Sequence, residues 1–236
     1  MKKVFLATAA LVFSAPAVAA DLGPVMAEPV APAYTFSWSG FYLGGNLGYG
    51  WGDSDLEFNT AGFFNLAPGD SAGFDIEGFV GGAHVGYNWQ IDNLVFGIET
   101  QISFSGIDGS GISPFFPATD SFHTDVDWYW SIAPRLGFAW DNLLFYAEAG
   151  YAGGNVETTL IAGGQDSFSD DSYQSGWTVG LGIDYAISPN WVVGLSYNYV
   201  DLGSAHSSGL TAAGNSTDQD NDVDFSTVKA RLSYKF

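Results

Sequence analysis

Residues 37 to 236 repeat one pattern eight times: large apolar side chains alternate with small or polar ones at every second position. A period of two residues is typical of a β-strand whose two faces meet different surroundings. Each repeat has about the 9–11 residues that a tilted strand needs to cross a lipid bilayer. The predicted strands span 41–51, 79–89, 94–104, 128–140, 143–151, 177–187, 191–199 and 228–236.

The connections between these strands alternate in length. Long polar loops are predicted at 52–77, 107–124, 158–173 and 203–222, and tight turns around 92–93, 141–142 and 188–190. Long loops at one end and short turns at the other are the plan of an outer-membrane barrel, with both chain ends on the periplasmic side. We therefore predict an all-β fold for residues 37–236, an eight-stranded antiparallel transmembrane up-and-down β-barrel.

A soluble up-and-down barrel such as a lipocalin shares the alternation but hides its apolar face inside. The charged residues decide between the two folds, because they lie on the face that also carries many glycines and few large side chains. Eight strands leave an interior just wide enough for side chains, and only this small, charged face fits it. The predicted luminal charges are His84, Glu99, Arg135, Glu148, Asp184, Lys229 and Arg231.

The tryptophans point to the same fold. A soluble core would place them at mid-strand at least as often as at strand ends, but here they gather at the strand ends on the bulky face. Amphipathic rings at both borders of an apolar band are the aromatic girdles of a membrane barrel. The predicted girdle residues are Trp51, Trp89, Trp128, Trp130, Trp140, Trp177 and Trp191.

Both ends of the predicted barrel carry a resemblance to a known family. The chain ends on apolar residues at alternate positions, namely Val228, Ala230, Leu232, Tyr234 and Phe236. This ending resembles the recognition strand that the barrel-assembly machinery of the outer membrane reads. The segment from Ser37 to Gly50 resembles the first strand of small alphaproteobacterial outer-membrane proteins, the porin-family or opacity-type group with a barrel like that of outer-membrane protein A. The resemblance implies a surface antigen of a Gram-negative outer membrane, and some members of this group bind haemin.

The residues before the barrel predict export. Lys2 and Lys3 are followed by an apolar stretch and by small residues at 17–20, so residues 1–20 form a predicted secretory signal peptide that is cleaved. The apolar run is too short to span about 30 Å of hydrocarbon as a helix. Residues 21–36 are rich in proline and form a predicted periplasmic linker. The predicted location is therefore the cell outer membrane.

The tight turns determine which residues of neighbouring strands face each other. If residues 141 and 142 form a two-residue loop, Arg135 and Glu148 are cross-strand partners in the lumen. The same argument places His84 opposite Gln101. We expect Arg135 and Glu148 to form an ion pair, because an unpaired buried charge is costly, and Glu99 could reach Arg135 from the other side. A gate, in which such pairs exchange partners, is the alternative to a purely structural network.

The chain is strongly acidic, with 26 Asp and Glu against six Lys and Arg and a net charge of −20. No nucleic acid is expected as a partner, because its phosphates would repel such a chain. The predicted loops carry most of the acids and no Lys or Arg. They form either a solvated anionic surface or a place where divalent cations join carboxylates to lipopolysaccharide phosphates. Residues 218–224 alternate oxygen ligands but lack the glycine and the closing glutamate of a calcium loop, so no metal site is assigned.

The sequence offers no catalytic group, since no nucleophile, base and orienting residue come together, and we expect no enzymatic activity. No cofactor is assigned, although the resemblance to haemin-binding proteins makes His123 and His206 candidate axial ligands of haem iron. We expect an integral outer-membrane protein that supports membrane integrity and makes surface contacts through four acidic extracellular loops, with lipid and lipopolysaccharide as partners. A narrow solute pore, for which the inward glycines leave room, and a haem-binding surface protein are the alternatives.

Overall fold

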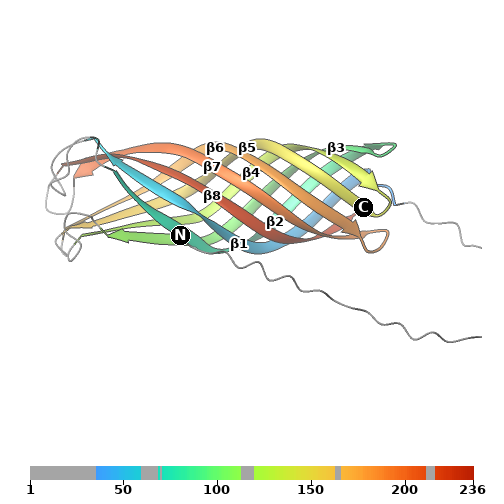
Figure 1. Cartoon of the computed structure of the whole chain (residues 1–236), viewed down its shortest axis with the longest axis horizontal. Helices are drawn as coiled ribbons and strands as arrows, with labels where there is room; N and C mark the ends of the chain where they lie inside the picture. Colours follow the sequence, from blue (N-terminus) through green and yellow to red (C-terminus); the bar gives the residue numbers. More distant parts are fainter. Residues whose placement is uncertain (1–35, 60–68, 70, 113–119, 163–165, 211–215) are drawn as a thin grey trace, which may run out of the picture. The chain divides into compact units, whose positions relative to one another are not determined.

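The computed structural model describes residues 36–59, 69, 71–112, 120–162, 166–210 and 216–236, which form a closed barrel of eight antiparallel strands in chain order (Figure 1). The predicted fold is confirmed. The predicted signal peptide at 1–20 and the predicted linker up to residue 35 lie outside the described residues. No helix in the described part of the chain is long and apolar enough to cross a membrane. The strands are β1 (Gly40–Phe58), β2 (Ser71–Ile91), β3 (Leu94–Ile112), β4 (Ser121–Trp140), β5 (Leu143–Ala162), β6 (Asp166–Ala186), β7 (Trp191–Leu210) and β8 (Ser216–Lys235).

Tight turns join the strands at one end of the barrel, which we call the short-turn end (Figure 1). Trp140 faces Leu143 across a two-residue loop, as predicted. That loop begins at Asp141, whose φ of 53° is a left-handed conformation that Asp tolerates better than most residues. The backbone nitrogen of Phe236 donates to the carbonyl oxygen of Phe41 at 3.0 Å, so the end of the chain closes the barrel against β1.

The strands are longer than predicted, with 19 to 21 residues each. The prediction of a loop at 52–77 is wrong for most of its length, because β1 and β2 stay paired from Asp53 and Asp75 to Glu57 and Ser71. The other three long loops are shortened in the same way. The connections that remain at this end are 59–70, 113–120, 163–165 and 211–215.

A reversal of polarity halfway along the strands explains this error. Towards the short-turn end of β1, Leu43 and Leu47 are exposed on the outer wall and Asn46 points into the lumen. Beyond Trp51, carboxylates occupy the outward positions, whereas Leu56 is fully buried inside. A search for apolar outward residues therefore ends at the reversal, although the backbone pairing continues past it.

The outward apolar band is as tall as the hydrocarbon layer of an outer membrane. From Phe41 to Trp51, a rise of about 3.3 Å per residue at a tilt of about 40° gives roughly 25 Å. The strands continue for roughly 15–20 Å beyond this band, and we call this part the protruding half. Its interior holds buried polar side chains such as Ser54, Thr124 and Asn221, which are hydrogen-bonded to one another. Beside them lie two apolar clusters, which include Ile76, Val80, Ile107, Val126, Tyr129, Val156, Val200, Val223 and Phe225, and Leu56, Phe58, Phe122 and Leu160.

Tryptophans border the apolar band on the outer wall. Near the short-turn end these are Trp89, Trp140 and Trp191, and at the opposite border they are Trp51, Trp128, Trp130 and Trp177. Both sets lie where amphipathic rings meet the membrane interfaces. Trp38 differs from them, because it is only 3% exposed and packs edge-on against Phe36, with ring centroids 4.7 Å apart.

Candidate functional site

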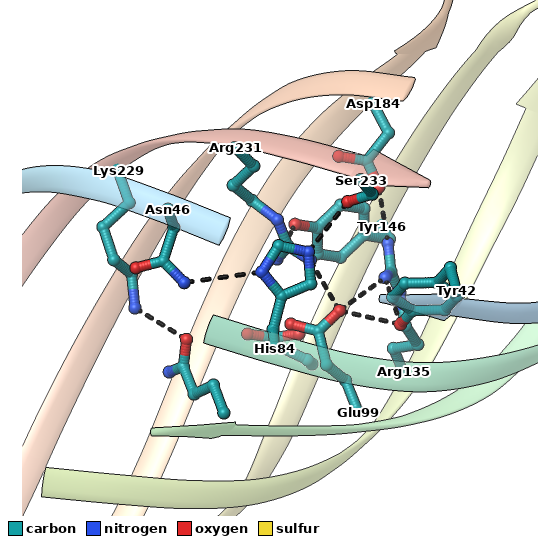
Figure 2. A network of polar contacts seen from close by, with 12 residues as sticks. Tyr42, Asn46, His84, Glu99, Arg135, Tyr146, Asp184, Lys229, Arg231 and Ser233 are labelled. Atoms are coloured by element: carbon teal, nitrogen blue, oxygen red, sulfur yellow. Dashed lines mark hydrogen bonds and ion pairs between the residues drawn. The ribbon is translucent and has the colours of Figure 1, made fainter. Parts of the chain in front are cut away.

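Side chains from six strands meet inside the part of the barrel that the apolar band surrounds, and Figure 2 shows them around the carboxylate of Glu99. All of them are buried. We call this set the luminal network, and its members are Tyr42 of β1, Glu99 of β3, Arg135 of β4, Tyr146 of β5, Asp184 of β6 and Arg231 of β8.

Glu99 lies at the centre of the luminal network. Its Oε2 accepts hydrogen bonds from Arg135 Nη1 at 3.0 Å and from Arg231 Nη2 at 2.6 Å. The Tyr42 hydroxyl donates to the same oxygen at 2.7 Å and accepts from Arg135 Nη1 at 2.8 Å. Hydrogen bonds between charged groups are about twice as strong as those between neutral groups. One carboxylate therefore ties β3 to β1, β4 and β8.

Asp184 supplies a second carboxylate to the network, which contains two guanidinium groups, those of Arg135 and Arg231. Arg135 Nη2 donates to Asp184 Oδ2 at 3.0 Å, and the guanidinium carbon lies 3.6 Å from the centroid of the Tyr146 ring. Arg231 Nη1 donates to the Tyr146 hydroxyl at 2.8 Å. Two buried cations thus meet two buried anions, which offsets the large cost of removing each charge from water.

Arg135 and Glu148 are register partners, as predicted, but the expected ion pair between them is wrong. Arg135 contacts Glu99 and Asp184 instead, and Asn198 Nδ2 donates to Glu148 Oε1 at 2.6 Å. The lumen of an eight-stranded barrel is so narrow that a long side chain reaches the far wall as easily as the next strand. Register on neighbouring strands therefore does not determine the ion pairs.

The remaining predicted luminal residues, His84 and Lys229, contact neutral groups. His84 faces Gln101, as predicted, and its ring nitrogens lie 3.4 Å from Asn46 Nδ2 and 2.8 Å from Ser233 Oγ (Figure 2). Lys229 Nζ donates to Gln101 Oε1 at 2.9 Å. The hydrogen-bond partners of these two side chains are thus amides and a hydroxyl, not carboxylates.

Glycines make room for the luminal network. Tyr42 lies opposite Gly86 and Tyr146 lies opposite Gly182, and a Cβ atom on either glycine would collide with the facing ring. Neither tyrosine was predicted as a luminal site residue, although a large aromatic residue on the glycine-rich face is a signal that the sequence carries. The space that these glycines were expected to leave for a narrow solute pore, the alternative function, is filled by side chains of the neighbouring strands.

Apolar side chains close the lumen on both sides of the luminal network. At the short-turn end a cluster plugs the mouth, with Phe36, Trp38, Val95, Ala139, Leu144, Tyr146, Ala186 and Val192 as members. At the other end lie the apolar clusters of the protruding half. A cavity lined by Trp38, Arg135 and Asp184 has a volume of about 10 Å³, which is roughly the space that one water needs.

Carboxylates line up across the strands on the outer wall of the protruding half. They are register partners in two rows that both begin on β2, and we call them the carboxylate belt. The rows are Asp75, Asp53, Asp224 and Asp201 on β2, β1, β8 and β7, and Glu77, Asp108, Asp125, Glu157 and Asp171 on β2 to β6. Like charges directly opposite each other destabilise a sheet. Repulsion within the carboxylate belt therefore lowers the stability of the barrel.

Neutralising one member of the belt should stabilise the barrel. Partial desolvation and the charges of Asp224 and Asp75 raise the pKa of Asp53, so the folded state binds this proton more readily than the unfolded state. The charged form therefore lowers stability at neutral pH. We expect Asp53→Asn to raise the free energy of unfolding in urea by about 0.5 kcal/mol at pH 7. The gain should fade as the pH falls through the raised pKa of Asp53 in the folded state and be lost below about 4, where Asp53 becomes protonated in both states.

The control for this prediction is Asp92→Asn, which removes an acid at the short-turn end. Both variants lose one negative charge, so a general effect of net charge would raise their stabilities equally. Loss of stability in Asp53→Asn at neutral pH would contradict the interpretation that the belt is repulsive.

The two candidate haem ligands lie on strands of the protruding half, not in loops. His123 Nε2 is 3.0 Å from Asp125 Oδ2 on β4. His206 on β7 lies 3.0 Å from Asp220 Oδ1 through Nδ1 and 3.6 Å from Asp218 Oδ1 through Nε2. Each histidine therefore already has carboxylates beside it.

The predicted recognition strand lies at the short-turn end of β8 and extends one residue beyond it. Its residues Val228, Ala230, Leu232, Tyr234 and Phe236 are all exposed on the outer wall. Tyr234 packs edge-on against Trp191 and Phe236, with ring centroids 5.3 and 5.1 Å away. In the closed barrel, β8 is paired with β1 on one side and with β7 on the other.

Comparison with known proteins gives consistent matches. The model of the outer membrane protein beta-barrel domain matches residues 5–236. The 31 kDa outer-membrane immunogenic protein of Brucella melitensis is 37% identical over 254 residues, which cover 100% of both chains. The 22 kDa outer membrane protein of Rhizobium leguminosarum is 33% identical over 73% of this chain and 67% of its own. The outer membrane protein OprG from Pseudomonas aeruginosa has a TM-score of 0.55 at 14% identity, over 85% of this chain and 98% of that one, which shows the fold alone.

Proposed function

Because the chain belongs to the outer membrane protein β-barrel domain family, we propose that it is a closed barrel that acts through its surface and conducts no solute. It is an integral outer-membrane protein. In the proposed orientation the short-turn end faces the periplasm and the protruding half faces outside the cell, as in other barrels of this architecture.

The filled lumen is the observation that carries this proposal. Glu99 and its partners cross the lumen at the level of the apolar band, and Trp38 with its neighbours closes the mouth below them. A water path would need the luminal network to separate and leave two buried guanidinium groups without counter-charges, which is strongly unfavourable. The network therefore supports a structural role rather than a gate.

The protruding half supports the surface role. Its outer wall is acidic and lies directly beyond the aromatic border, where lipopolysaccharide phosphates are found. We expect lipid and lipopolysaccharide as partners in the membrane, the barrel-assembly machinery as the partner that recognises β8, and no enzymatic activity. The Brucella relative carries the name of an immunogenic protein, and the protruding half would present the corresponding surface in this chain.

Single-channel recording in a planar bilayer tests the closed lumen. We expect no discrete current steps from the refolded chain, because the luminal network and the plug at Trp38 occupy the pathway. Flotation of the same preparation with vesicles, and its shift in mobility on heating, would show that the protein is folded and inserted. Reproducible steps from such a preparation would contradict the proposal and make the luminal charges selectivity residues.

A further inference from the structure

Three metal-ligating side chains come together on the outer wall of the protruding half. Asp108 on β3 and Asp125 on β4 are register partners, so their carboxylates point the same way from neighbouring strands. His123 precedes Asp125 by two residues and therefore lies on the same face of β4. One ligand atom from each of the three lies within 4.8 Å of the others.

The donor types suit a transition metal. We propose that Asp108, His123 and Asp125 bind a divalent first-row transition ion of the Zn²⁺ type, with water in the remaining positions. Carboxylate oxygens and an imidazole nitrogen are zinc ligands at about 2.0–2.2 Å, so donors on one tetrahedral ion are about 3.3 Å apart. Binding would therefore draw the three donor atoms together from their present spacing of up to 4.8 Å. The imidazole favours such ions over Mg²⁺ and Ca²⁺, which prefer oxygen ligands.

Electrostatics also favours a cation at this place. Asp125 faces Asp108 on one side and Glu157 on the other, in the middle of a row of the carboxylate belt. The Lys and Arg residues of the chain are at 2, 3, 135, 229, 231 and 235. Those in the described part of the chain lie in the lumen or near the short-turn end, so none neutralises this row. A bound ion would supply the missing positive charge.

The second exposed histidine provides a matched contrast. His206 also lies beside two carboxylates, but Asp220 approaches its Nδ1 and Asp218 its Nε2. Both carboxylates also accept hydrogen bonds from Asn59 Nδ2, at 2.8 Å from Asp220 and 3.4 Å from Asp218. Two acids on opposite sides of one ring cannot share an ion with a single ring nitrogen. One histidine and two aspartates are thus present there too, but their ligand atoms do not converge on one place.

Titration of the refolded chain with Zn²⁺ tests the site, and Co²⁺ serves as a spectroscopic probe because its visible absorption reports ligation. We expect one tightly bound Zn²⁺ per chain that millimolar Ca²⁺ does not displace. His123→Ala and Asp108→Asn should each weaken binding at least tenfold and abolish the visible Co²⁺ band, whereas His206→Ala should leave both unchanged. All three positions are on the outer wall, and the heat-induced shift in mobility would verify that each variant is folded.

Two results would overturn the proposal. Equal Zn²⁺ affinity in His123→Ala and the unchanged chain would show that imidazole is not a ligand. Displacement of Zn²⁺ by Ca²⁺, or an equal loss in His206→Ala, would show diffuse binding to the carboxylates. Neither result depends on conductance, so the metal site and the closed lumen succeed or fail separately.

Discussion

Replacing Glu99 with glutamine is expected to destabilise the barrel by about 3–5 kcal/mol, the usual effect of removing one partner from a buried charge network. The carboxylate of Glu99 binds Arg135, Arg231 and the Tyr42 hydroxyl, and it is 4% exposed. The neutral amide keeps the shape of the side chain but leaves two guanidinium groups with one carboxylate. The free energy of unfolding in urea, measured in lipid vesicles, reports this loss.

Glu148→Gln is the matched control for Glu99→Gln. Glu148 is also a buried glutamate, but the bond described for its carboxylate is the one from Asn198, so we expect a much smaller loss. If the two variants are equally destabilised, the network does not centre on Glu99. If Glu148→Gln loses more stability than Glu99→Gln, Arg135 pairs with Glu148 in the membrane. That result would support the alternative of a gate, in which charge pairs exchange partners.

Gly48→Ala is expected to lower the free energy of unfolding by about 2 kcal/mol, as overpacking of a tight interior does. Gly48 of β1 faces Lys229 of β8, and an added Cβ would collide with the Val228 carbonyl oxygen and with the backbone and side chain of Lys229. Because part of the obstruction is backbone, the strands must separate to admit the methyl group. Lys229 would then lose its place at Gln101.

Gly45→Ala, on the same strand, is the control for Gly48→Ala. Gly45 lies on the outer wall, where the nearest atom to an added Cβ is the Gly82 carbonyl oxygen at 3.6 Å, an ordinary contact. We expect this variant to be neutral or slightly stabilised, because alanine loses less backbone entropy than glycine on folding. A similar loss in both variants would mean that strand entropy, and not the close approach of β8, decides the effect.

Local signals in the sequence predict the framework of this barrel. Alternation shows which face of each strand meets lipid, and a two-residue loop sets the register of the adjoining strand segments, so that Trp140 faces Leu143 and His84 faces Gln101. Between β4 and β5 this register shifts at a bulge between Val126 and Trp128. The length of the strands was missed because their polarity reverses beyond Trp51. Acidic outward residues that alternate with apolar inward residues still form a strand, but one whose outer face meets water instead of lipid.

The contacts across the lumen could not be predicted in the same way. The expectation that Glu99 could reach Arg135 is confirmed. Asp184 on β6 and Tyr42 on β1 were not predicted as partners of Arg135, because their height relative to β4 depends on the stagger accumulated around the closed barrel. The 113–120 and 163–165 connections do not reveal that stagger, because long connections leave the register open. The burial of Trp38 was missed for a related reason, since its binding place exists only once the barrel has closed.

The apolar cluster inside the protruding half is separate from the lipid-facing band of the same strands. Val126, Val200 and Phe225 pack with one another away from lipid, so this half holds its shape without the bilayer. Peptides grafted between β1 and β2 or between β7 and β8 would be held by paired strands, roughly 15–20 Å from the membrane surface. In the proposed orientation, we expect variation at these tips to leave insertion undisturbed, so the chain would suit the display of peptides outside the cell.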